Sequence, residues 1–163
     1  FIRLGEKLLQ KFGPKKPIIW GALIIGFAIL LLMQTQIMTG QYVVLAVIAY
    51  SLFGLGLAFF ATPATDAALS NLPDNQAGSG AGIFKMASSL GTSFGVAIAA
   101  GINTAVSSRA EPIAWLNNII HFTGRQDNVA IRQGAMLGLA FCLLLAILVI
   151  ITVVKMIPDK KKE

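Results

Sequence analysis

Residues 17–65 read PIIWGALIIGFAILLLMQTQIMTGQYVVLAVIAYSLFGLGLAFFATPAT and contain no Asp, Glu, Lys or Arg. A single helix of these 49 residues would be about 73 Å long, over twice the roughly 30 Å thickness of a bilayer core. The stretch must therefore turn back on itself, and its polar, turn-forming residues gather at 34–41. We expect membrane-spanning helices near 18–33 and 42–62, with Pro63 ending or bending the second.

Two further apolar stretches follow along the chain. Residues 77–106 are interrupted only by Lys85, and residues 133–154 carry no charge. Overall, 56% of the 163 residues are hydrophobic and 12% are charged, whereas soluble domains have roughly 45–50% apolar and about 25% charged residues. The sequence therefore predicts an all-α integral membrane protein with four transmembrane helices, in contact with the lipid bilayer.

Basic residues predict the orientation of these helices. Five Lys or Arg lie in residues 1–16, three in 107–132 and four in 155–163. The positive-inside rule places the first and last of these segments in the cytoplasm and the loop 107–132 outside. The net charge of +6 follows from this topology, and the chain has no separate basic domain for nucleic acid. Because residue 1 falls within a basic loop, we expect the chain to be the C-terminal part of a longer protein.

The four predicted spans differ in composition. Spans 18–33 and 133–154 are aliphatic on most sides and are expected to face lipid, whereas 42–62 and 77–106 are rich in Gly, Ser and Ala and are expected to pack inward. In the third span, small residues recur every four positions from 87 to 99, which allows close approach of a neighbouring helix. This pattern favours a packing role, with or without sliding during a transport cycle, for Gly82, Gly91 and Gly95.

Signals for catalysis or metal binding are weak. Residues 91–95, GTSFG, match a nucleophile-elbow pattern, but they lie within an apolar helix and not after a strand. The glycine-rich residues 78–82 lack the spacing of a phosphate-binding loop. His121 has no second ligand near it in the sequence, and Cys142 lies among apolar residues, as expected of a packing side chain. The sequence predicts neither an enzyme nor a metal or cofactor site.

Ionisable and aromatic residues near the predicted membrane boundaries have several possible roles. Lys85 could extend its ammonium group to the cytoplasmic surface, pair with Asp66 or another acid, or contact a substrate. Within the outer loop, residues 112–122 have apolar residues at helical spacing, with Trp115 beside them. They predict a short helix at the outer interface.

Two segments resemble a known family. Residues 5–17, GEKLLQKFGPKKP, resemble the basic inner-loop motif of the major facilitator superfamily, in its second-half copy, with Glu6 and Gln10 at positions where the motif has glycine and aspartate. The residues that carry this resemblance are Lys7, Lys11, Gly13, Lys15 and Lys16. Residues 78–101 are similar to the penultimate helix of the fourteen-span drug:proton antiporters, which include bacterial quinolone and quaternary-ammonium efflux pumps.

The resemblance implies a fold and a function. The four predicted spans would be the last four of fourteen helices, in the C-terminal six-helix half of a major facilitator fold in the bacterial cell membrane. Drugs and protons would be transported by alternating access together with the remaining N-terminal helices. No carboxylate lies at mid-membrane depth in this chain, so a proton carrier is expected elsewhere in the protein. The candidate cavity residues, for which ordinary helix packing is the alternative, are Tyr50, Phe53, Ser89, Ser93 and Phe94.

A self-contained four-helix membrane protein is the alternative, either a small oligomeric exporter or a scaffold that transports nothing. A small exporter is expected to carry an acid within a span, and this chain has none. A scaffold needs no cavity, yet two of the spans are rich in small and hydroxyl residues. A channel would need a polar stripe or a charged ring along its helices, and neither recurs at helical spacing.

Overall fold

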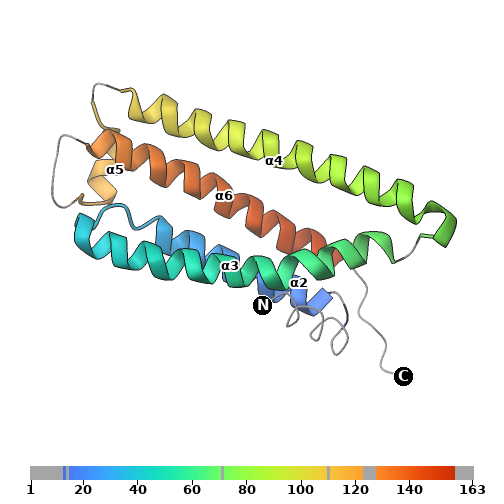
Figure 1. Cartoon of the computed structure of the whole chain (residues 1–163). Coiled ribbons are helices and arrows are strands. Elements are labelled where there is room, and N and C mark those ends of the chain that lie inside the picture. Colours follow the sequence, from blue (N-terminus) through green and yellow to red (C-terminus); the bar gives the residue numbers. More distant parts are fainter. Residues whose placement is uncertain (1–12, 14, 71, 110, 123–127, 157–163) are drawn as a thin grey trace.

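The structure, a computed structural model, describes residues 13, 15–70, 72–109, 111–122 and 128–156, and these form helices joined by short turns and loops (Figure 1). The elements are α2 (Lys15–Leu32), α3 (Thr39–Leu69), the 3-10 turn η1 (Asp74–Gln76), α4 (Ala77–Ser107), α5 (Ala114–Ile119) and α6 (Val129–Met156). Helices α2, α3, α4 and α6 are long and apolar enough to cross a membrane. The prediction of an all-α membrane protein with four such helices is confirmed.

Two helix ends differ from the boundaries expected from sequence. Helix α2 begins at Lys15, so Lys15 and Lys16 lie in its first turn and not in a preceding loop. Helix α3 continues through Pro63 to Leu69, so the proline does not end the helix and Asp66 lies within it. A proline removes only one backbone donor, and the rest of the turn can continue when the helix is packed on both sides of it.

Only a small part of the basic segment 1–16 falls within the described residues. Lys7 and Lys11 lie outside them, as do residues 157–163 of the predicted cytoplasmic tail. Gly13 is described and has a φ of 71°. This left-handed backbone conformation favours glycine and is typical of a turn before a helix.

Helix α2 is the most buried of the four and packs along both α3 and α6. A Cβ atom built at Gly21 would lie 2.8 Å from the Gly56 carbonyl oxygen and 2.8 Å from the Phe60 amide nitrogen, both on α3. The two backbones approach this closely only because both crossing positions, Gly21 and Gly56, are glycine. Span 18–33, expected to face lipid, therefore packs on protein along one side, whereas Trp20, Leu23 and Phe27 on α2 are exposed. Aliphatic side chains suit a protein neighbour as well as lipid, so composition did not distinguish the two.

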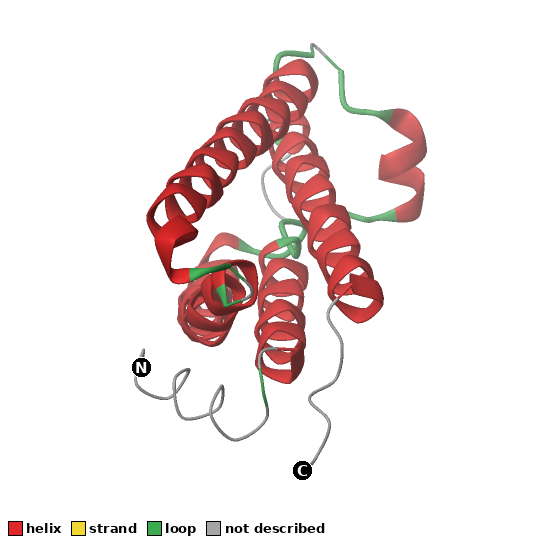
Figure 2. Ribbon diagram, turned by 90° about the vertical axis from the view of Figure 1, so that its right-hand side faces the viewer, coloured by secondary structure: helices red, strands yellow, loops and turns green. Residues whose placement is uncertain are grey.

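Helices α4 and α6 meet at one end and separate towards the other. At the meeting point, Gly134 faces Asn103, with 2.7 Å between a built Cβ atom and the Asn103 carbonyl oxygen, and Gly138 faces Ala99 at 3.1 Å. Figure 2 shows the two helices spreading from this point like the arms of a V. As a result α4, expected to be an inner helix, has few contacts with α3 and no buried residue in its most apolar window.

Polar side chains form hydrogen bonds to the backbone at the end of the bundle where α5 lies, which Figure 1 shows. The Arg132 guanidinium donates hydrogen bonds to the carbonyl oxygens of Thr35 and Ile37 in the turn between α2 and α3, and the Thr35 hydroxyl donates back to the Arg132 carbonyl oxygen at 3.1 Å. The fully buried Gln133 side chain accepts from the Ile113 amide at 2.8 Å and donates to the Ile113 carbonyl oxygen at 3.3 Å. These bonds join three segments that are distant in sequence.

The helix predicted within residues 112–122 is present as α5, and only part of it faces outward. Leu116 is buried in a cluster with Phe122, Val129 and Met136. Trp115 and Ile119 are 58% and 70% exposed. One side of this segment therefore completes the protein core, and the other side is open to the surroundings of the bundle.

Candidate functional site

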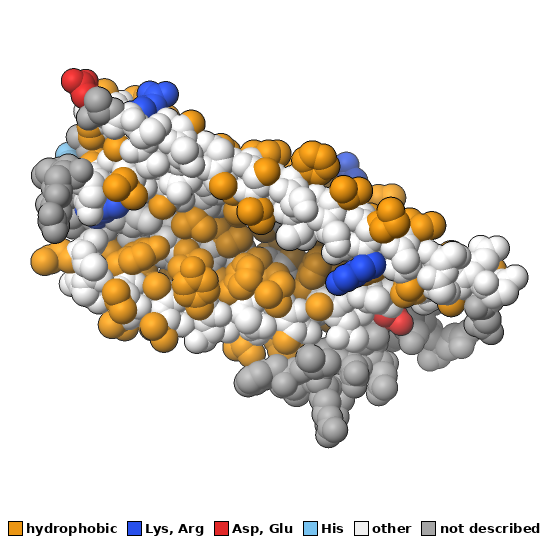
Figure 3. All heavy atoms as spheres, turned by 45° about the horizontal axis from the view of Figure 1, so that its top comes forward, with side chains coloured by type: hydrophobic (Ala, Val, Ile, Leu, Met, Phe, Trp, Pro, Cys, Tyr) orange, Lys and Arg blue, Asp and Glu red, His pale blue; other side chains and the backbone are white. Residues whose placement is uncertain are grey.

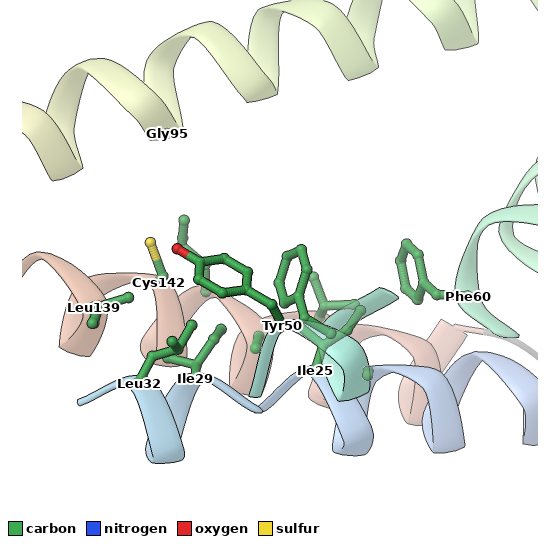
Figure 4. Close-up of a pocket in the computed structure, with 13 residues that line it drawn as sticks. Ile25, Ile29, Leu32, Tyr50, Phe60, Gly95, Leu139 and Cys142 are labelled. Carbon is green, nitrogen blue, oxygen red and sulfur yellow. The ribbon is translucent and has the colours of Figure 1, made fainter. Parts of the chain in front are cut away.

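A cavity of about 450 Å³ lies between α2, α3 and α6, with α4 across from them. In the space-filling view, hydrophobic side chains gather along a hollow beside α4 (Figure 3). The close-up shows side chains from the lower helices rising into this space beneath Gly95 of α4 (Figure 4). The lining residues are Ala22, Ile25, Ile29, Leu32, Tyr50, Phe53, Phe60, Gly95, Leu139, Cys142, Leu145, Ala146 and Val149.

The cavity exists because of how the helices meet. Gly21 and Gly56 bring α2 and α3 into contact, and α2 also packs on α6, which makes a continuous floor of three helices. Gly134 and Gly138 fix α4 to α6 at one end only. Because α4 then diverges from α6 (Figure 2), the cavity remains between Gly95 of α4 and the floor.

The chemistry of this lining is almost purely apolar. The side-chain polar groups are the Tyr50 hydroxyl and the Cys142 thiol, and none of the lining residues is charged. Figure 4 shows the Tyr50 ring across the floor, with its hydroxyl directed to the end where Cys142 and Leu139 lie. A ligand pocket typically has a volume of roughly 300–1,000 Å³ and a largely apolar lining. This cavity can hold an apolar or aromatic group by burial, but the lining offers no acid or base for proton transfer.

The structure brings together only some of the predicted site residues. Tyr50 and Phe53 line the cavity, as does Gly95. Ser89, Ser93 and Phe94 lie on exposed parts of α4 and do not line it, with Phe94 66% exposed. The Ser93 hydroxyl donates to the Ser89 carbonyl oxygen at 3.0 Å. Successive helical residues point about 100° apart, so Phe94 and Gly95 face different ways, and a cavity role for Ser89, Ser93 and Phe94 remains a prediction.

Sequence reasoning missed the contribution of α2 and α6. Helix α6 supplies five lining residues, Leu139, Cys142, Leu145, Ala146 and Val149, although its span was expected to face lipid. One available signal was the spacing of Gly134 and Gly138, a small-xxx-small pattern that is typical of a helix contact. That pattern marks α6 as a helix with a protein neighbour.

The predicted packing glycines of α4 have open surroundings among the described residues. A Cβ atom built at Gly82, Gly91 or Gly95 meets no atom within 4 Å. Their packing role remains a prediction, because it requires a neighbouring helix other than those that the structure describes.

The two charged candidates lie near the turn between α3 and α4, Asp66 in the last part of α3 and Lys85 in the first part of α4. Asp66 and Lys85 are both exposed, and no ion pair joins them in the structure. Asp66 borders a shallow hollow with Ala61, Thr62 and Thr65. Among the residues that the structure describes, no three His, Cys, Asp or Glu side chains are grouped as metal ligands would be.

The chain is similar to known drug-resistance proteins. It is 43% identical over 122 residues to the quinolone resistance protein NorB of Staphylococcus aureus strain MRSA252, and 44% identical over 124 residues to the proteins of that name in strains JH9 and N315. Each match covers 71% of this chain and 26% of the relative, so the chain corresponds to about a quarter of the length of these proteins. No family model and no solved structure matches the chain. The chain is therefore a homologue of the NorB quinolone resistance proteins, and the relationship to bacterial drug-resistance proteins predicted from its sequence is confirmed.

Proposed function

We propose that this chain is part of a bacterial efflux transporter of the major facilitator type and supplies one wall of its drug-binding cavity. The transporter would export amphipathic or cationic drugs, including quinolones, across the cell membrane in exchange for protons. The chain itself would act together with helices that correspond to the rest of the NorB length. It would bind and release a drug and would not act as an enzyme.

The observation that carries this proposal is the apolar cavity between the four helices. Its volume of about 450 Å³ and its aromatic side chains Tyr50, Phe53 and Phe60 suit the flat ring system of a quinolone or a dye. Helix α4 also exposes glycines and serines that lipid contact does not require. Exposed small residues on a helix that borders the cavity are expected where further helices of a larger transporter pack against it.

Proton coupling would come from elsewhere in the transporter. The cavity lining has no carboxylate, and Asp66, the acid within α3, lies exposed near the end of that helix. The chain's part in an alternating-access cycle would therefore be to hold the apolar part of the drug while another region titrates.

A matched pair of substitutions on α6 tests the cavity. Leu145 lines it, whereas the neighbouring Leu144 is 53% exposed and does not. Leu145→Trp would fill the cavity, and Leu144→Trp adds the same bulk on another side of the helix. In bacteria that express the intact transporter, we expect Leu145→Trp to lower norfloxacin and ethidium efflux about tenfold, the equivalent of about 1.4 kcal/mol of drug binding, with Leu144→Trp near the parental rate. Equal rates for the two variants at matched membrane abundance would contradict the proposal.

A second experiment separates the proposal from a self-contained exporter. Residues 1–163 expressed alone in a drug-sensitive strain should give no proton-dependent dye efflux, because the cavity lining has no carboxylate to carry a proton. Efflux by this segment alone would favour the small oligomeric exporter.

A further inference from the structure

We propose that Gly95 determines which drugs the cavity accepts by leaving room for large substituents beneath α4. This inference rests on the proposed function, and it assigns to Gly95 a role in specificity that differs from helix packing.

The first observation is the position of Gly95. It is the residue through which α4 lines the cavity, and the other twelve lining residues come from α2, α3 and α6. In Figure 4 it lies across the open space from Tyr50 and Cys142. A side chain at this position would therefore have floor residues opposite it and no lining residue of α4 beside it.

The second observation is the space around Gly95. A Cβ atom built there meets no heavy atom within 4 Å, whereas one at Gly21 or Gly134 would come within 2.8 Å of backbone atoms. Close backbone contact thus explains the glycines at 21 and 134 but not the glycine at 95. A larger residue at 95 would leave the described helix contacts intact and take up cavity volume instead.

The consequence is a dependence on ligand size. Each carbon added at position 95 shortens the distance between α4 and the floor that a ligand can span. Small or flat ligands would still enter, and ligands with bulky substituents would be excluded, since apolar contact gives selectivity through shape and volume and not through hydrogen bonds. Cys142 on the floor provides a chemical reporter of that space, and it is the single cysteine of the chain.

The test is a graded series, Gly95→Ala, Gly95→Val and Gly95→Leu, in the intact transporter. The matched control is the same series at Gly101, which lies on the same helix, is exposed, has no atom within 4 Å of a built Cβ and does not line the cavity. Efflux is measured for norfloxacin and for moxifloxacin, which share the fluoroquinolone ring system, moxifloxacin having the bulkier substituents at N1, C7 and C8. We expect Gly95→Leu to lower moxifloxacin efflux about tenfold more than norfloxacin efflux, corresponding to about 1.4 kcal/mol, and the Gly101 series to preserve the parental ratio.

A labelling experiment tests the same geometry without transport. Membranes are treated with N-methylmaleimide or the larger N-(1-pyrenyl)maleimide, and modification of the Cys142 peptide is followed by mass spectrometry. We expect the rate with the pyrenyl reagent, relative to the methyl reagent, to fall progressively from Ala to Leu at position 95 and to stay constant across the Gly101 series.

Two results would overturn the inference. If the Gly95 variants lower the efflux of both quinolones equally, or leave both unchanged, the residue does not select by size. If the ratio of the two labelling rates at Cys142 is the same in all Gly95 variants, a side chain at position 95 does not narrow the cavity. If the unaltered protein exports neither quinolone, the proposed function fails, and the labelling series alone tests the inference.

Discussion

Gly21 of α2 and Gly91 of α4 occupy similar sequence surroundings but very different structural ones. A Cβ atom built at Gly21 would lie within 3 Å of two backbone atoms of α3, whereas one built at Gly91 has no heavy atom within 4 Å. Both stand in apolar helices among small and aliphatic residues. A glycine in a membrane helix therefore permits a close contact without requiring one, and its neighbour decides which case applies.

The largest effect is expected where the contact is made by backbone on both sides. In Gly21→Ala, the new methyl group would lie 2.8 Å from the Gly56 carbonyl oxygen and the Phe60 amide nitrogen. Neither atom can rotate away, so α2 and α3 must separate, at a cost of about 1–3 kcal/mol. The apparent Tm of the purified protein in detergent should fall by several degrees.

The control for this change lies on the same helix. A Cβ at Gly26 would lie 3.8 Å from a Leu143 methyl carbon, which is an ordinary van der Waals contact. Gly26→Ala should leave the apparent Tm unchanged or slightly raised. A similar fall for both variants would mean that α2 does not tolerate alanine for a reason other than the contact with α3.

A smaller effect is expected where α4 meets α6. In Gly134→Ala, the new methyl group would lie 2.7 Å from the Asn103 carbonyl oxygen and from its side-chain oxygen, whereas at Gly138 the nearest atom, the Ala99 carbonyl oxygen, is 3.1 Å away. The Asn103 side chain can rotate, so part of the overpacking cost of about 1–3 kcal/mol is relieved.

Thermal unfolding of a double variant checks this interface. Gly134→Ala should lower the apparent Tm more than Gly138→Ala, and adding Asn103→Ala should restore part of the loss, because it removes one of the two clashing oxygens. Equal losses for the two glycine variants, with no restoration, would place the contact elsewhere on α4.

The polar contacts near α5 should contribute less per residue. Arg132→Lys keeps the charge but cannot reach the Thr35 and Ile37 carbonyl oxygens together, because only the guanidinium has a planar fork of donors. We expect a loss of about 1 kcal/mol, the net value of one or two such hydrogen bonds. Arg109→Lys, at an exposed position, serves as the control in the same unfolding assay, and an equal change in both variants would contradict the prediction.

The sequence correctly predicted four membrane-spanning helices, because the runs of uncharged residues and the length of a bilayer crossing determine their number. It placed Tyr50 and Phe53 on the second span, and both line the cavity. It did not identify the residues that α2 and α6 contribute to the floor of the cavity. Leu, Ile and Val have similar transfer energies into lipid and into a protein interior, so an aliphatic helix gives no sign of which it contacts.

The continuation of α3 past Pro63 is a second feature that the local sequence does not determine. A proline predicts an interruption from its missing donor and its ring, but α3 continues six residues beyond it. Pro63 is fully buried, so packing on its surface supports the helix where the backbone hydrogen bond is lost. Whether a helix continues past a proline depends on such neighbours, which local sequence does not describe.

The smallest effect is expected at Gly91, and it decides how α4 functions. In an open helix position, alanine is favoured over glycine by up to about 1 kcal/mol, because glycine loses more backbone freedom on folding. Nothing lies within 4 Å of a Cβ at Gly91, so Gly91→Ala should leave the apparent Tm of the intact protein unchanged or raise it slightly. The measurement is the same unfolding assay, run beside Gly21→Ala. A fall as large as that of Gly21→Ala would instead show that another helix of the protein packs against Gly91, and it would restore α4 to the inner position that its small residues predict.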